Sequence, residues 1–84
     1  MVVEDVLKII EQENLVGYNL FEKRENRENE IVIKKDGQNW VVYATDERAS
    51  KVTGSEKVFV TEESALDNFV KRTRTLNILK KCNI

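Results

Sequence analysis

The chain has no histidine and a single cysteine among its 84 residues. Without histidine it lacks the commonest general base near neutral pH and the commonest metal ligand, and it cannot form a Ser–His or Cys–His nucleophilic pair. Cys82 alone can form neither an internal disulfide nor the usual four-ligand zinc site. Carboxylate catalysis would need a cleft, and a chain this short leaves little room for one. We therefore expect no enzymatic activity, no bound metal and no cofactor.

Long apolar runs are also missing, so no segment resembles a membrane helix of roughly 18 or more apolar residues, and no signal peptide opens the chain. Hydrophobic residues make up 40% of the sequence, which suffices for a core. We expect one small domain spanning residues 1–84, located in the cytoplasm, where a lone cysteine stays reduced.

The net charge of −1 conceals a polarity along the chain. Residues 1–47 carry a charge of −5, and residues 48–84 carry +4. Such a division can orient a charged partner. A nucleic-acid-binding domain is usually basic overall, so the slightly negative net charge argues against nucleic acid as the partner.

Hydrophobic periodicity predicts two helices that enclose four strands. The first helix covers the stretch VVEDVLKIIEQENL with a stop near Gly17, and the second begins after a capping Thr61. Asp36-Gly37 is a strong hairpin signal between two β-branched runs. The predicted strands cover residues 18–23, 30–35, 40–45 and 57–60.

The predicted fold class is α+β, in the order α-β-β-β-β-α. Short connections between successive strands favour an antiparallel meander, with the N-terminal and C-terminal helices packed on one face. Alternation along residues 40–45 places Trp40, Val42 and Ala44 on one face of the sheet. Val41 and Tyr43 then lie on the other face.

A charged corner, Asp46-Glu47-Arg48, follows the aromatic strand directly. Together with Tyr43 it is our predicted partner-binding surface, because charge pairs and aromatic anchors give specificity to protein interfaces. The simpler interpretation is a solvated turn in which Asp46 is the turn former. Two adjacent carboxylates do not make a calcium loop, so we predict no metal here.

A second possible surface is the basic C-terminal helix, which could contact phosphates. Its cations have no interleaved aromatic residues, and a solvated helix face explains them equally well. The alternative function is therefore a small nucleic-acid-associated or regulatory protein, with the contact residues Lys71, Arg72, Arg74, Lys80 and Lys81. A homodimer built on an open edge or face of the sheet is compatible with either function.

Two stretches, WVVYATDER (40–48) and TEESALDNFVKRTR (61–74), with a short strand ending near Phe59 between them, resemble the small immunity proteins of bacterial polymorphic toxin systems, especially those of Gram-positive bacteria. The resemblance covers about residues 18–75. It implies a non-enzymatic cytoplasmic protein that binds and neutralises one cognate toxin protein. It rests on Trp40, Tyr43, Asp46, Glu47, Arg48, Phe59, Ala65, Leu66 and Phe69.

Overall fold

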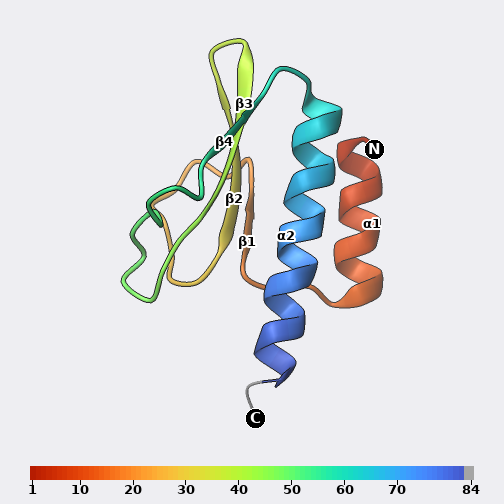
Figure 1. The fold of residues 1–84 in the computed structure, drawn as a ribbon. Helices are drawn as coiled ribbons and strands as arrows, with labels where there is room; N and C mark the ends of the chain where they lie inside the picture. The colour runs from red at the N-terminus through yellow and green to blue at the C-terminus, as the bar shows by residue number, and fades with distance from the viewer. Residues whose placement is uncertain (83–84) are drawn as a thin grey trace.

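A computed structural model describes residues 1–82 and has the predicted element order (Figure 1). The α+β class is confirmed, with two helices and four strands in the described chain. The elements are α1 (Val3–Glu13), β1 (Tyr18–Leu20), β2 (Ile31–Asp36), β3 (Asn39–Ala44), β4 (Lys57–Phe59) and α2 (Glu62–Cys82).

The four strands form one sheet in the order β1-β2-β3-β4. The β2–β3 and β3–β4 pairs are antiparallel, as predicted. Asp36 pairs with Asn39, so the hairpin closes with a two-residue turn in which Gly37 takes a φ of +63°.

The β1–β2 pair is parallel, and the prediction of a wholly antiparallel meander was wrong at this point. Residues 21–30 form no tight turn. They carry the chain back to the end of the sheet where β1 began, so that the Ile31 N–H donates to the Gly17 carbonyl and the Phe21 N–H donates to the Ile33 carbonyl. The sheet is therefore mixed, and the long connection is a consequence, because a parallel pair cannot be joined by a hairpin.

Both helices lie on the same side of the sheet, as predicted (Figure 1). Phe69 and Leu66 of α2 are fully buried and pack in one cluster with Ile33 and Val42 of the central strands. Val6 brings α1 into the same cluster. Each such side chain contributes about 1.5–3 kcal/mol through burial, so this layer supplies most of the apolar stabilisation.

The helix ends follow local chemistry. The Thr61 hydroxyl accepts a hydrogen bond from the Ser64 N–H at 3.2 Å, which confirms the predicted cap of α2. Helix α1 ends at Glu13, earlier than the predicted stop at Gly17, because Asn14 adopts the left-handed conformation with a φ of +53°.

The other face of the sheet carries a second, smaller buried cluster of Val32, Val41 and Tyr43. This agrees with the predicted alternation along β3. Neither α1 nor α2 covers this face (Figure 1), and the connections 21–30 and 45–56 lie against it instead. Within residues 1–82, no helix is both long and apolar enough to cross a membrane.

Candidate recognition surface

Two adjoining hollows lie on the side of the sheet that the helices leave uncovered. The larger has a volume of about 860 Å³ and is bordered by residues 21–26, with Val32, Lys34 and Tyr43 among its lining residues. The smaller, of about 560 Å³, is lined by Arg27, Glu28, Glu47, Arg48 and Ala49. Ala49 lines both hollows, so we treat them as one feature and call it the concave surface.

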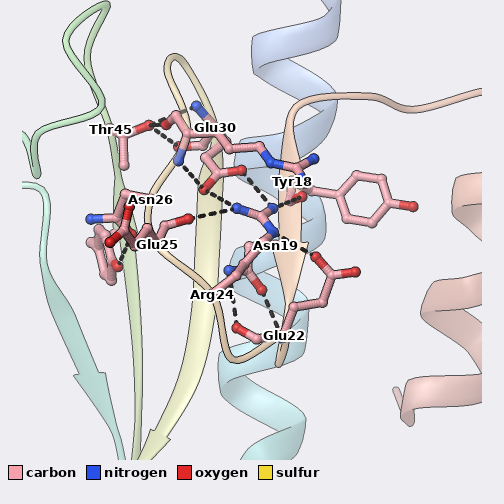
Figure 2. Close-up of polar contacts among 10 residues, drawn as sticks. Tyr18, Asn19, Glu22, Arg24, Glu25, Asn26, Glu30 and Thr45 are labelled. Atoms are coloured by element: carbon pink, nitrogen blue, oxygen red, sulfur yellow. Dashed lines mark hydrogen bonds and ion pairs between the residues drawn. The ribbon is translucent and has the colours of Figure 1, made fainter.

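A buried ion pair fixes the 21–30 connection (Figure 2). The Arg24 guanidinium donates to both carboxylate oxygens of Glu30, at 3.1 and 2.9 Å. The Glu30 side chain is only 3% exposed and that of Arg24 is 18% exposed. Arg24 also donates to the carboxylate of Glu22 and to the carbonyl oxygens of Tyr18 and Glu25. A single guanidinium thus links β1 to both ends of the connection.

The electrostatics of Glu30 reflect this pairing. Burial alone would raise the pKa of the Glu30 carboxyl group, but hydrogen bonds from Arg24 and from the Arg27 backbone N–H, together with the Arg24 charge, lower it below its ordinary value. The pKa of Arg24 is raised, chiefly by its hydrogen bonds to Glu30 and then to Glu22. Both groups therefore stay charged at neutral pH.

The start of the connection is a strained turn held by Asn19. Its side-chain oxygen accepts from the Glu22 N–H at 2.7 Å, and its side-chain nitrogen donates to the Glu22 carbonyl at 3.2 Å. Between these residues Phe21 takes a φ of +59°, which is unfavourable for a bulky side chain. The buried Asn19 stabilises that conformation and so sets the direction in which the connection leaves β1.

Thr45 joins the end of the connection to the end of β3. Its hydroxyl accepts from the Glu30 N–H at 2.9 Å and donates to the Arg27 carbonyl at 2.7 Å. The Thr45 N–H donates to the Glu30 carbonyl. These bonds hold the 27–30 turn beside the Asp46-Glu47-Arg48 corner, so two polar segments that are distant in sequence share one surface.

At the corner itself, Asp46 shapes the turn and its two neighbours face solvent. The Asp46 carboxylate accepts from the N–H groups of Arg48 and Ser50, at 2.8 and 3.0 Å. The Asp46 carbonyl accepts from the Asn29 N–H. Glu47 and Arg48 are exposed, and their side chains make no hydrogen bond or ion pair to any residue of the described range 1–82. Asp46 is thus a turn former, whereas Glu47 and Arg48 are available to a partner.

Tyr43 lies at the floor of the larger hollow and is only 5% exposed. Its hydroxyl donates to the Asn26 side-chain oxygen at 2.6 Å. The ammonium groups of Lys34 and Lys51 lie 5.6 and 5.2 Å from its ring centroid, at cation–π distance. Tyr43 therefore helps to hold the 21–30 connection against the sheet, and little of its own surface is accessible to a partner.

The basic side chains of α2 that the structure describes do not form one surface. Lys71 and Arg72 line a groove beside β4, whereas Arg74 pairs with Glu13 of α1. Lys80 lies near Gly17, in the turn before β1. Lys81 belongs to α2, but its side chain lies outside the part that the structure describes. Nucleic-acid binding along the helix would require these cations to act together.

Sequence reasoning missed the residues that build the concave surface, above all Arg24, Asn26, Glu30 and Thr45. Residues 24–29 were predicted to be a loop between two strands, and the pairing of Arg24 with Glu30 was not predicted. One signal was present: Glu30 immediately precedes the β-branched run of β2, and a carboxylate at the start of a buried strand needs a cationic partner. In residues 1–82 no group of three or more His, Cys, Asp or Glu side chains is arranged to hold a metal ion.

The comparisons with known proteins agree with the sequence resemblance. Residues 2–84 match the model of a protein family described as Immunity protein 59. No match was found among curated proteins or among solved structures. The family model covers nearly the whole chain, including both helices, all four strands and the two connections that form the concave surface. The chain belongs to the Immunity protein 59 family.

Proposed function

We propose that the protein binds one cognate toxin domain in the cytoplasm and neutralises it by covering the toxin's functional site, without catalysis. The observation that carries this proposal is the family match over residues 2–84. The structure supports it with a surface suited to binding, since the concave surface is rigidly framed and bears free charges at its rim.

The frame of the concave surface is built from satisfied polar contacts. Arg24, Glu30 and Thr45 fix the connection 21–30 on one side, and Asp46 fixes the corner on the other. A binding surface that is already ordered loses less conformational entropy on association. The concave surface should therefore bind with little rearrangement.

The rim of the concave surface carries exposed charges of both signs. They are Lys23, Glu25, Arg27, Glu28, Glu47 and Arg48. Mixed charges at a rim set the orientation and specificity of an interface more than its total affinity. The complementary surface of the toxin should accordingly carry acidic and basic groups in alternation, instead of a field of one sign.

Co-expression with the toxin domain encoded by a neighbouring gene tests this proposal. The wild-type chain should form a tight one-to-one complex and restore growth. Exchanging charges in the double variant Glu47→Lys, Arg48→Glu should weaken the complex by at least about tenfold while leaving thermal unfolding unchanged, because neither side chain has an intramolecular partner within residues 1–82. Asp46 is left intact, since it holds the turn.

A matched control is the exchange Lys8→Glu, Glu11→Lys on α1, on the helical side of the molecule (Figure 1). It also preserves net charge and should leave toxin affinity unchanged. Equal weakening by both exchanges would show that the concave surface is not the toxin-binding surface. If the wild-type chain neither binds that toxin nor protects cells against it, the protein does not neutralise that toxin.

A further inference from the structure

A second groove lies on the helical side of the sheet, between α2 and the β3–β4 end. Its volume is about 440 Å³. Apolar lining comes from Ile31, Ala44, Leu76 and Leu79, and the Leu79 side chain is more than half exposed. We call this feature the α2 groove. Because it opens on the side of the sheet opposite the concave surface, it is independent of the proposed toxin contact.

Arg72 lies half-buried in the α2 groove without a compensating charge. Its Nη1 atom is buried and has no hydrogen-bond partner among the described residues. The pKa of Arg72 is lowered by burial, with no carboxylate opposing the effect. One helical turn earlier, the buried Asn68 side-chain oxygen also lacks a partner. Unsatisfied buried groups of this kind destabilise the free protein and favour a ligand that pairs with them.

Two further cations border the α2 groove. Lys57 and Lys71 are exposed, and neither forms an ion pair within residues 1–82. No aspartate or glutamate is among the residues that line the groove. Three positive charges thus surround a partly apolar cleft, whereas Arg24, Lys51 and Arg74 elsewhere in the fold pair with carboxylates.

We propose that the α2 groove binds an acidic segment of a protein partner that also carries an apolar side chain. A carboxylate of the segment pairs with the solvent-facing part of the half-buried Arg72 guanidinium. The apolar side chain packs against Leu76 and Leu79. This assignment accounts for the three cations, the lack of a carboxylate beside Arg72 and the exposed leucine together.

The same cations could attract a nucleic acid, but the groove fits a peptide better. A nucleic-acid strand is bound by cations that follow its backbone and by aromatic platforms for its bases. The cations here converge on one short cleft with aliphatic lining and no aromatic residue. An acidic peptide with an apolar side chain matches both the charge and the aliphatic lining.

Titration with a short capped peptide of alternating leucine and glutamate, labelled with fluorescein, tests the proposal by anisotropy. Backbone NMR on the unmodified protein should show shifts concentrated at residues 57, 68, 71 and 72. Arg72→Gln should weaken binding by about tenfold, as expected for the loss of a charge-assisted hydrogen bond. Arg74→Gln removes the same charge from the same helix outside the groove and should leave affinity unchanged.

Lys71→Gln, an exposed substitution, replaces Arg72→Gln if the latter does not fold, and it should also weaken the peptide complex. The proposal is overturned if the wild-type protein does not bind the acidic peptide, or if the shifts map elsewhere. It is also overturned if a short single-stranded oligonucleotide binds more tightly at these residues. The concave-surface exchange at 47 and 48 should not alter peptide binding, so the two proposals fail separately.

Discussion

The Glu30 carboxylate accepts two hydrogen bonds from the Arg24 guanidinium at a site where only 3% of the Glu30 side chain is exposed. These two residues lie six positions apart within the irregular 21–30 connection. Polar pairing therefore fixes the conformation of the 21–30 connection, whereas apolar burial fixes the helical layer.

Glu30→Gln should lower the free energy of unfolding by about 3 kcal/mol, because the partly buried Arg24 charge loses its buried partner and keeps only the exposed carboxylate of Glu22. Urea denaturation followed by circular dichroism measures this. In a double-mutant cycle with Arg24→Gln, the coupling energy should be about 1–3 kcal/mol. The exposed Arg74–Glu13 pair is the comparison, and its Arg74→Gln variant should lose about 1 kcal/mol or less. Additive losses from Arg24 and Glu30 would contradict the prediction.

Stability should fall in acid through Glu30. Its pKa in the folded protein lies below the ordinary value of 4.5, so the folded state binds protons less readily than the unfolded state. The contribution is complete above the ordinary value and is lost as the pH falls through the lower, folded one. Denaturant titrations between about pH 7 and pH 3 should show a shallower acid slope for Glu30→Gln than for wild type. Parallel slopes would assign the acid sensitivity to other groups.

Ala49→Gly should stabilise the protein. Ala49 has a φ of +62°, and a Cβ atom in this region costs about 1–2 kcal/mol. Glycine removes this strain, but it also gives the unfolded chain more conformational entropy, which offsets part of the gain. The net gain should be about 0.5–1 kcal/mol, visible as a raised melting temperature. The paired test is Ala44→Gly on β3, which has no such strain and should destabilise. A loss at position 49 would show that the Ala49 methyl group contributes packing that outweighs its strain.

Gly17→Ala should destabilise the protein by at least about 1 kcal/mol more than Gly37→Ala. Both glycines have a positive φ, of +73° and +63°, so the backbone strain is comparable. A Cβ atom at Gly17 would lie 3.1 Å from the Asn29 carbonyl oxygen and 3.0 Å from Leu76, whereas one at Gly37 would meet nothing within 4 Å. Thermal unfolding of the two variants gives the difference. Equal losses would mean that the backbone near Gly17 yields easily.

Much of the fold could be predicted from the sequence, because local periodicity decides it. The alternation along β3 placed Val42 and Tyr43 on opposite faces of the sheet, as observed. Asp36-Gly37 located the hairpin. The spacing of the basic residues also predicts that they face different ways. Residues two positions apart on a helix point about 200° apart around its axis, so Arg72 and Arg74 contact different neighbours.

The parallel β1–β2 pair and the concave surface could not be predicted in this way. Strand direction depends on where the 21–30 connection returns, and that depends on the pairing of Arg24 with Glu30 and on the contacts of Thr45. Such contacts follow no helical or strand period. The charged corner was found from sequence, but its neighbour across the surface, the 27–30 turn, is brought there by tertiary hydrogen bonds alone.

In the 21–30 connection, some side chains hold the backbone in place and others face solvent. Arg24, Asn26 and Glu30 turn inward and hold the backbone, whereas Lys23, Glu25, Arg27 and Glu28 are exposed between them. Changes at the exposed positions would therefore alter the chemistry of the rim without altering its shape. If the concave surface binds a toxin as proposed, a few surface substitutions, each nearly neutral for folding, should change which toxin it accepts.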